Sequence, residues 1–245
     1  MANFPGYVPN IQVAMSNPCG EIPLRDSNTE HLAKITLRKL EQVKNSSGRL
    51  RNFFGILNKV EKKSLAVCGG AVRDWWFLRD PKDIDLVVDC PEKVIHMLAS
   101  NFKHRKSQFN GYVFDVGGIK IDIWRLQDSW AFTQNPLMEK TWGNLLYSFP
   151  FDIDSVLVFA DGSVKENGFF DSLNRREIEL VNPINKNPVT NIVQRAVRFK
   201  EKYGFRFGPK LQAEVDRHCN KSGIDYDKLF KEIQQRAVAS GESSN

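Results

Sequence analysis

Two aspartates separated by one residue, Asp83 and Asp85, form the part of the sequence best suited to chemistry. They begin the run 83–88 (DIDLVV), whose apolar and β-branched residues predict a strand. Side chains at i and i+2 of a strand point to the same side, so we expect the two carboxylates to lie close together. Paired carboxylates repel each other unless a cation lies between them, and hard oxygen ligands favour Mg²⁺ or Mn²⁺. The pair therefore predicts a divalent-cation site, whereas an isolated Asp-x-Asp is more often a solvated strand end.

A glycine turn stands shortly before this pair. Residues 64–68 predict a short buried strand that stops at Gly69 and Gly70, and the composition of residues 71–78 predicts a helix. Two glycines let a ligand approach the backbone, and the N–H groups of the first helical turn point toward it. Arg73 adds a guanidinium suited to phosphate oxygens. Strand, turn and helix together predict a cradle for a polyphosphate.

A third aspartate, Asp122, stands in an otherwise apolar strand. The alternation in residues 112–116 and 119–126, with two glycines between them, predicts a hairpin. The alternation places Asp122 on the face opposite the isoleucines of its strand. A carboxylate without a partner is costly to bury. Asp122 therefore needs a metal, another cation or exposure to solvent, and these alternatives stay open at this point.

These motifs carry a family resemblance. The run 69–74 (GGAVRD), followed by 82–86 (KDIDL), resembles the head domain of class II CCA-adding enzymes and bacterial-type poly(A) polymerases, in the polymerase-β-like nucleotidyltransferase superfamily. The resemblance implies an α+β fold, a head with a small mixed β-sheet flanked by helices. It implies Mg²⁺ or Mn²⁺ held by Asp83, Asp85 and Asp122, which are also the implied catalytic residues. The implied reaction transfers a nucleoside monophosphate from a nucleoside triphosphate, ATP or CTP, to a hydroxyl and releases pyrophosphate.

The resemblance also extends toward the C-terminus. Residues 194–199 (QRAVRF), with 203–205 (YGF), resemble the neck helix of the family. The resemblance also implies which glycines and charged residues contact the nucleotide: Gly69, Gly70, Arg73, Asp74, Lys82, Arg125, Asp154, Arg195 and Arg198.

The chain divides into three segments. Residues 1–30, rich in Pro, Asn, Ser and Gly, predict an irregular leader. Residues 31–183 predict the head domain with its N-terminal helices, for which helical spacing is seen at 28–44 and 50–60. Residues 184–245 predict a neck-like helical region. The N-terminal and C-terminal helical segments would therefore flank the sheet domain.

The leader contains a second, short resemblance. Residues 16–24 are similar to the active-site loop of ribonucleotide reductases, with Asn17, Cys19 and Glu21 at the same spacing. That reaction requires a large α/β barrel and further cysteines, and the rest of the chain follows another pattern. We interpret this match as chance or as a relic of a neighbouring gene.

Composition restricts the partners. The 35 basic residues exceed the 29 acidic ones and give a net charge of +6, which favours a polyanion such as a nucleotide or RNA. The four cysteines include no C-x-x-C pair, which favours reduced thiols and a cytoplasmic location. No window approaches the roughly 20 apolar residues of a transmembrane helix, so no membrane partner is expected. Whether the leader and the C-terminal helices support a homo-oligomer stays open.

Two parts of the family pattern are missing. Where the CCA-adding enzymes carry Arg-Arg-Asp to grip the ribose, this chain has residues 148–150 (SFP). Where they carry the base-reading Glu-Asp-x-x-Arg, it has residues 188–192 (PVTNI), and only 40 residues follow Phe205. A site that loses its hydrogen-bonding groups loses most of the discrimination they supply, so programmed CCA addition is not expected.

Three hypotheses follow. The leading one is a metal-dependent nucleotidyltransferase that acts on an RNA 3′ end. The second directs the same chemistry to a hydroxyl of a protein or small molecule. The third is a non-catalytic RNA- or protein-binding module of the same fold, which the retained glycines, Arg73 and three aspartates argue against, because an inactive copy has no need of them.

Overall fold

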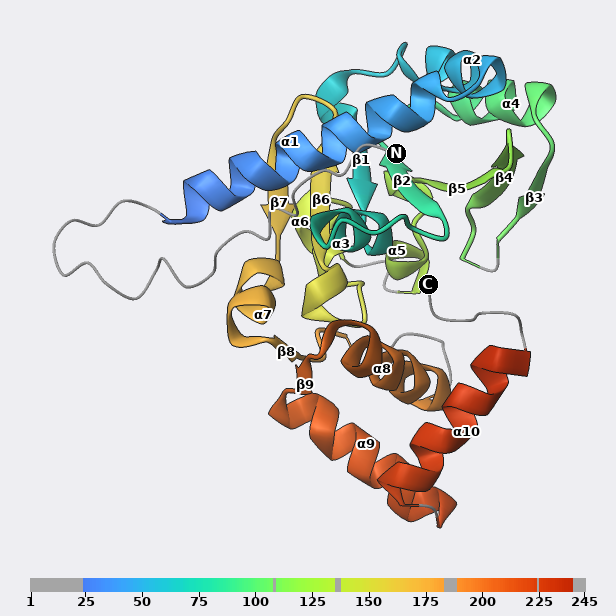
Figure 1. Cartoon of the computed structure of the whole chain (residues 1–245). Helices are drawn as coiled ribbons and strands as arrows, with labels where there is room; N and C mark the ends of the chain where they lie inside the picture. Colours follow the sequence, from blue (N-terminus) through green and yellow to red (C-terminus); the bar gives the residue numbers. More distant parts are fainter. Residues whose placement is uncertain (1–23, 108, 135–137, 183–188, 224, 240–245) are drawn as a thin grey trace, which may run out of the picture.

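The centre of the molecule is a mixed seven-stranded sheet (Figure 1). The computed structural model describes residues 24–107, 109–134, 138–182, 189–223 and 225–239. The strand order is β3-β4-β5-β2-β1-β6-β7, with β2 and β5 parallel and the other neighbours antiparallel. The strands are β1 (Leu65–Cys68), β2 (Ile84–Val88), β3 (His104–Lys106), β4 (Tyr112–Val116), β5 (Ile119–Arg125), β6 (Val156–Phe159) and β7 (Val164–Glu166). The predicted α+β class, with helices around a mixed sheet, is confirmed.

The register of the strands decides which side chains share a face. Asp85 in β2 lies opposite Asp122 in β5 and opposite Cys68 in β1. Partners at the same register point to the same side of a sheet, so these three side chains share one face. The intervening residues, such as Leu86 and Ile123, are buried on the other face.

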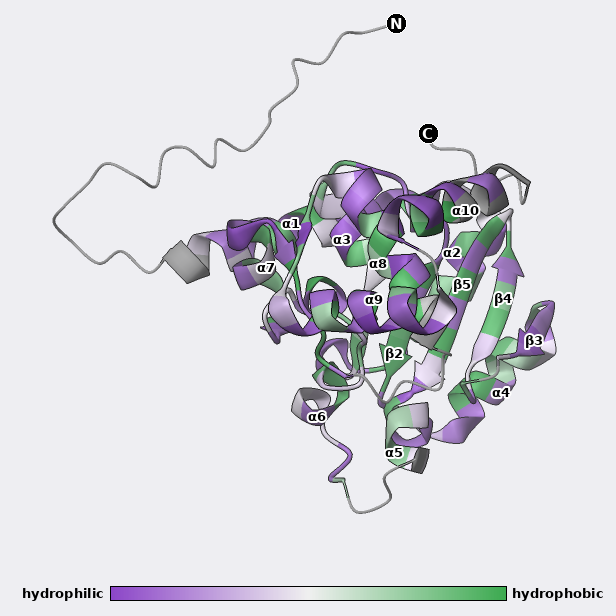
Figure 2. Ribbon diagram, turned by 90° about the horizontal axis from the view of Figure 1, so that it is seen from below, coloured by the Kyte–Doolittle hydropathy of each residue, from purple (hydrophilic) through white to green (hydrophobic). Residues whose placement is uncertain are grey.

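That other face carries the larger hydrophobic core. Four helices cover it: α1 (Leu24–Asn45), α2 (Gly48–Leu57), α3 (Gly70–Trp76) and α4 (Glu92–Asn101). Phe53 of α2 is fully buried, and its ring packs edge-on against Phe54, Phe102 and Phe114. Figure 2 shows hydrophobic residues along the central strands and hydrophilic residues on the outer turns of the helices. The amphipathic patterns of the sequence are thus satisfied against this face.

The first helix begins earlier than the pattern predicts. It starts at Leu24 instead of residue 28, so residues 24–30 of the expected irregular leader are helical. Asn17, Cys19 and Glu21 of the reductase-like stretch lie outside the described residues. No helix in the described part of the chain is both long and apolar enough to cross a membrane.

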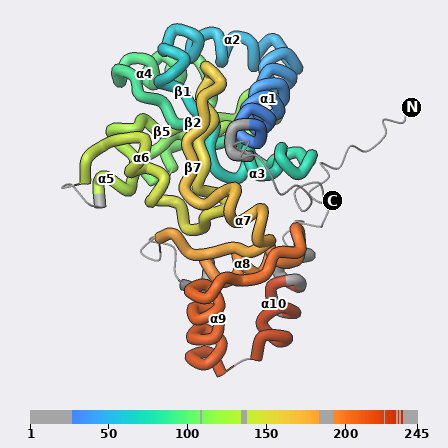
Figure 3. The backbone as a smooth tube through the Cα atoms, turned by 90° about the vertical axis from the view of Figure 1, so that its left-hand side faces the viewer, coloured from blue at the N-terminus to red at the C-terminus, as the bar shows by residue number. Residues whose placement is uncertain are grey.

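The aspartate-bearing face is only partly covered. The short helices α5 (Trp130–Gln134) and α6 (Trp142–Leu146) pack on it over a second, smaller apolar cluster that includes Val87, Leu126 and Phe132. Figure 3 shows α5 and α6 on one side of the strands, with α1 and α3 on the other. Asp85 and Asp122 precede this cluster along their strands. The face therefore has an acidic end and an apolar end.

The C-terminal helices form a separate layer beside the sheet domain (Figures 1 and 3). The chain reaches it through α7 (Phe169–Arg175) and β8 (Glu177–Ile178), which pairs in parallel with β9 (Arg206–Phe207). The helices of this layer are α8 (Val189–Tyr203), α9 (Pro209–Ser222) and α10 (Tyr226–Ala239). The remaining short elements are the 3-10 turns η2 (Lys62–Ser64), η3 (Leu126–Asp128) and η4 (Asp152–Asp154).

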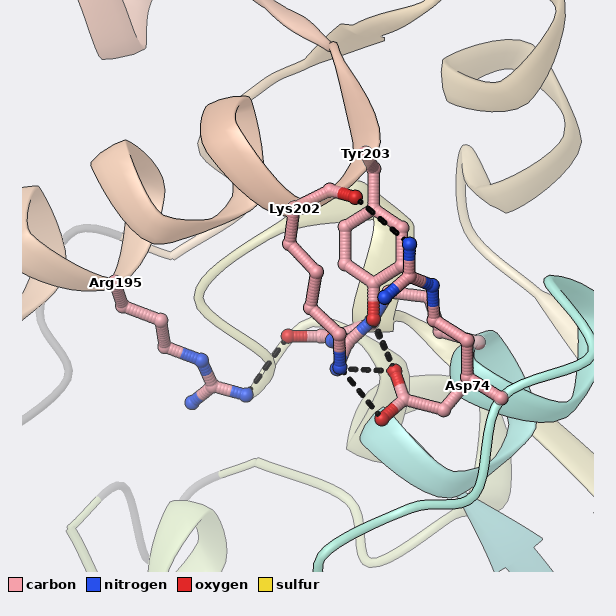
Figure 4. Close-up of polar contacts among 7 residues, drawn as sticks. Asp74, Arg195, Lys202 and Tyr203 are labelled. Carbon is pink, nitrogen blue, oxygen red and sulfur yellow. Dashed lines mark hydrogen bonds and ion pairs between the residues drawn. The ribbon is translucent and has the colours of Figure 1, made fainter. Parts of the chain in front are cut away.

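A buried ionic network joins α8 to the sheet domain (Figure 4). Arg73 of α3 is 6% exposed, and its guanidinium donates to the carboxylates of Asp74 and Asp154. Its Nη2 lies 2.9 Å from Asp74 Oδ1, and its guanidinium carbon lies 4.3 Å from the centre of the Phe199 ring in α8. Burial by itself lowers the pKa of Arg73, but the charges of Asp154 and Asp74 outweigh it and raise that pKa. Arg73 therefore stays charged in the interior.

Side chains of α8 complete the network. The Tyr203 hydroxyl donates to Asp74, and Lys202 Nζ lies 3.2 Å from the second oxygen of the same carboxylate. Arg195 Nη2 donates to Asp154 Oδ2 at 2.8 Å. The network thus fixes α8 against α3 and η4 through charge-assisted hydrogen bonds.

We predict that Arg73→Met lowers the free energy of unfolding by about 3–5 kcal/mol, because two buried carboxylates lose the cation they share. Urea denaturation measures the loss. Arg195→Met is the matched control: Arg195 is 44% exposed and Asp154 keeps Arg73, so a loss of about 1 kcal/mol or less is expected. Equal losses in the two variants would contradict the central role of Arg73.

Candidate functional site

The structure gathers Asp83, Asp85 and Asp122 at the acidic end of the sheet face. Asp83 directly precedes β2, and Asp85 and Asp122 are register partners in β2 and β5. Burial, followed by the charges of Asp83 and Asp122, raises the pKa of Asp85 to about 8. Burial also raises the pKa of Asp122, to which Asp83 adds, whereas Lys120 and Arg105 act in the opposite direction. These shifts show that the cluster resists carrying its full negative charge.

A lysine that the sequence reasoning missed partly neutralises this cluster. Lys120 Nζ donates to Asp83 Oδ2 at 2.8 Å and lies 3.9 Å from Asp122 Oδ1. The signal was available in the sequence, because Lys120 stands two residues before Asp122 in the same predicted strand and so shares its face. The ammonium group of Lys120 is therefore a cation in direct contact with this cluster.

The three carboxylates fit a divalent cation by their chemistry. Within the described ranges, no three His, Cys, Asp or Glu side chains already stand in the arrangement of a metal centre. However, Asp122 Oδ1 is buried and accepts no hydrogen bond from the described residues. An oxygen of this kind, beside two further carboxylates, suits Mg²⁺ or Mn²⁺. A bound divalent cation would take the contact with Asp83 that Lys120 now makes.

The glycine turn lies directly against the carboxylates. Gly69 has φ +63°, a backbone conformation that favours glycine, and α3 starts at the next residue. A β-carbon at position 69 would lie 3.7 Å from Asp85 Oδ2 and 3.4 Å from Phe149 Cε1. The predicted order of strand, glycine turn and helix is present, and it brings the backbone of Gly69 and Gly70 beside Asp85.

Three of the residues expected to contact a nucleotide are internal. Arg73, Asp74 and Asp154 are 6%, 5% and 0% exposed, and all three belong to the network that holds α8. Their position corrects the expectation that Arg73 offers its guanidinium to phosphate, because that guanidinium is bound by two carboxylates. The motif at residues 69–74 could not predict these contacts, because Tyr203 and Lys202 come from a helix far along the chain.

Arg125, expected to contact a phosphate, lies on the other face of the sheet. Arg125 pairs with Val88 in register and so projects from the face opposite Asp122. Its Nε donates to the Cys90 carbonyl at 3.2 Å and its Nη1 lies 3.0 Å from Asp128 Oδ2, which corrects its expected position at a phosphate.

The other three predicted cations are at the surface. Lys82 is exposed next to Asp83, and Arg198 is exposed on α8. Arg195, also on α8, lines a cavity together with Asp85. Of the three, Arg195 is thus the residue that the structure brings to the carboxylates, and its charge lowers the pKa of Asp85.

This cavity, of about 160 Å³, is lined by Asp85 of the acidic end and by Val87 and Leu145 of the apolar end of the face. Four aromatic rings, which the sequence reasoning also missed, line it: Phe109, Trp124, Trp130 and Phe149. The sequence gave a signal for two of them: Trp124 alternates with Asp122 on one strand face, and Phe149 stands where the CCA-adding enzymes carry Arg-Arg-Asp.

Comparison with known proteins shows what this arrangement is similar to. Residues 65–141 match the family described as poly A polymerase head domain. The matched segment contains the glycine turn, β2 with its aspartates and β5 with Asp122. No curated protein sequence matches the chain at a significant level.

Solved structures share the fold, and 38 chains match. The Thermotoga maritima CCA-adding enzyme complexed with tRNA is 20% identical, with a TM-score of 0.54, over 76% of this chain and 45% of that one. A CCA-adding enzyme with CTP is 18% identical, with a TM-score of 0.57, over 87% and 51%. A tRNA nucleotidyltransferase complexed with a primer tRNA and an incoming ATP analog is 18% identical, with a TM-score of 0.52, over 72% and 57%.

This chain spans about half the length of the structures it matches. Residues 65–141 are therefore similar to the poly A polymerase head domain, and the chain shares the nucleotidyltransferase fold of the CCA-adding enzymes.

Proposed function

We propose that this protein is a metal-dependent nucleotidyltransferase that moves a nucleoside monophosphate from ATP or CTP to the hydroxyl of an RNA 3′ end. The observation that carries the proposal is the convergence of Asp83, Asp85 and Asp122 on one sheet face beside the glycine turn. The family match supports the reaction class. The similar structures, which are complexes with CTP, an ATP analog and tRNA, support the choice of partners.

Each part of the site has a task in this proposal. Asp83, Asp85 and Asp122 would hold Mg²⁺ or Mn²⁺, which neutralises phosphate charge during the transfer. The backbone at Gly69 and Gly70 would receive the triphosphate tail. The buried network around Arg73 would keep α8, and with it Arg195, in place beside the site. Catalysis of this kind depends mainly on charge neutralisation and positioning.

The basic edge of the sheet favours RNA as the acceptor. β3 is an exposed edge strand. Its Arg105 pairs with Val113 of β4, and Val113 pairs with Asp122 of β5, so Arg105 and Asp122 lie on the same face of the sheet. The charge of Arg105 lowers the pKa of Asp122. A polyanion that approaches this edge would find cations on the same face as the carboxylates.

A cytoplasmic location, favoured by the cysteine pattern, is part of the same proposal.

The reaction itself provides the main test. Incubation with labelled ATP or CTP, Mg²⁺ or Mn²⁺, and total cell RNA is expected to label RNA. Asp83→Asn and Asp85→Asn are expected to lower the rate by at least about 100-fold, because phosphate charge is no longer neutralised. Asp89→Asn, at an exposed site just after β2, is the matched control and should keep the native rate.

Nuclease and protease treatment of the labelled product then identifies the acceptor. If the label resists nuclease and is lost on protease treatment, the acceptor is a hydroxyl of a protein and not of RNA. Native rates in both aspartate variants would defeat the metal assignment.

Lys120 is expected to compete with the divalent cation. Lys120→Met removes the ammonium from Asp83 and Asp122, so Mn²⁺ should bind about fivefold more tightly to the protein without nucleotide. Titration followed by electron paramagnetic resonance of free Mn²⁺ measures the change. Lys165→Met is the control, since Lys165 lies in the same register row but on the exposed edge strand β7. Weaker Mn²⁺ binding in Lys120→Met would show that the lysine supports the site instead.

The raised pKa of Asp85 predicts how stability depends on pH without metal. Between its ordinary pKa of 3.8 and about 8, the folded protein keeps a proton on Asp85 that the unfolded chain releases. The stability from this group is therefore complete below about pH 4 and is lost as the pH rises through 8. Asp152, whose pKa burial raises to about 7, contributes with the same sign.

Urea denaturation between pH 5 and 9 tests this dependence. Asp85→Asn should be more stable than the native protein at pH 9 and should show a smaller decline, with the part from Asp152 remaining. Added Mg²⁺ should restore stability at pH 9 in the native protein only. A native protein that gains stability from pH 5 to 9 without metal would contradict the prediction.

A further inference from the structure

The aromatic cavity lies directly beside the reacting groups. Asp85 and Phe149 both line this cavity. Phe149 also reaches the glycine turn, since a β-carbon added at Gly69 would lie 3.4 Å from Phe149 Cε1. The volume of the cavity, about 160 Å³, is roughly ten times what a single water needs. The cavity can therefore accept a ring-sized group attached to a phosphate chain held at the glycine turn.

The rings around this space are held in position. Trp124 of β5 packs so closely over Gly111 that a β-carbon there would lie 2.3 Å from Trp124 Cδ1 and 2.8 Å from the Ile123 carbonyl oxygen. Trp130 meets Phe109 edge-on, with ring centres 6.1 Å apart at an angle of 78°. All four rings are partly exposed. Fixed, accessible aromatic faces are the surfaces on which planar heteroaromatic groups stack.

The cavity offers few polar side chains that could recognise a ligand by hydrogen bonds. Besides the indole N–H groups of Trp124 and Trp130, the polar lining consists of Asp85, Arg195, Cys68, Ser129 and Ser148. The Ser148 hydroxyl donates to the Leu145 carbonyl at 2.6 Å, and burial raises the pKa of the Cys68 thiol well above its ordinary value. Stacking with little hydrogen-bond readout accepts any base, with preferences that follow stacking strength.

We propose that this cavity binds a nucleobase, which stacks on Trp130 and Phe149 while its phosphates lie toward Gly69 and Asp85. The proposal rests on the proposed function, since it assumes that nucleotides reach the carboxylates. The base belongs either to the nucleoside triphosphate or to the 3′-terminal nucleotide of the acceptor. Both sources present the same planar heteroaromatic ring.

Isothermal titration calorimetry on the full chain tests the proposal. The ligands are ATP, CTP, inorganic tripolyphosphate, which has no base, and a single-stranded hexaribonucleotide, each with Mg²⁺. Trp130→Leu and Phe149→Leu keep an apolar side chain and remove the ring. Trp142→Leu is the matched control, because Trp142 packs on Phe159 in the neighbouring apolar cluster and does not line the cavity. Circular dichroism and urea denaturation check that each variant folds.

We expect at least about tenfold weaker binding of ATP, with unchanged tripolyphosphate binding, in both ring variants. Trp142→Leu should bind like the native protein. If only the hexaribonucleotide loses affinity, the base comes from the acceptor, which also supports the proposal.

Native affinity of ATP and of the hexaribonucleotide in both ring variants would overturn the proposal. An equal loss with tripolyphosphate would overturn it as well, since a stacking site cannot act on a ligand without a base. Either result leaves the proposed function standing, because that depends on the labelling of RNA and its loss in Asp83→Asn and Asp85→Asn.

Discussion

Repulsion among three carboxylates on one sheet face is the constraint on which the site depends. Asp83, Asp85 and Asp122 are brought together by the parallel pairing of β2 and β5, and burial makes their charge more costly. The protein relieves this cost with the ammonium of Lys120 and by a raised pKa at Asp85. A divalent cation would relieve it more fully, since it carries two charges and accepts several oxygen ligands. The same groups thus oppose folding without a metal, and under our proposal they would hold one.

A second charged cluster has the opposite character, because its charges are paired. Arg73 binds two carboxylates in the interior, and side chains of α8 complete the set. Breaking such a set is costly, which makes it suitable for fixing one helix against another. The Gly-Gly-x-x-Arg-Asp motif therefore has two separate tasks in this structure. Its glycines form the turn beside Asp85, and its Arg and Asp hold the C-terminal helices.

In our proposal, the aromatic cavity holds a base by a different means from the one that the resemblance suggests. The base-reading Glu-Asp-x-x-Arg of the CCA-adding enzymes is replaced by residues 188–192, and the Arg-Arg-Asp position is occupied by residues 148–150. Phe149 and Pro150 of that replacement line the cavity. The replacement at residues 148–150 thus supplies apolar and aromatic surface to the cavity. A change from pairing to stacking lowers base selectivity more than affinity.

The sequence by itself determined the local features of this protein. The strand before Gly69, the helix after it and the spacing of Asp83 and Asp85 follow from periodicity and turn chemistry, which act over a few residues. The α+β class was expected from the family resemblance that these motifs carry. Lys120 could also have been assigned to the face of Asp122, since only two residues separate them in one strand.

Only the tertiary structure decided which of these features meet. The pairing of β2 with β5 joins Asp85 to Asp122, and the docking of α8 brings the Tyr203 hydroxyl to Arg73 from 130 residues away. The side of the sheet that Arg125 occupies follows from the same register. Such pairings depend on how whole elements bury their apolar faces together. Local sequence patterns report the shape of each element and leave the choice of its neighbours to the packing of the complete chain.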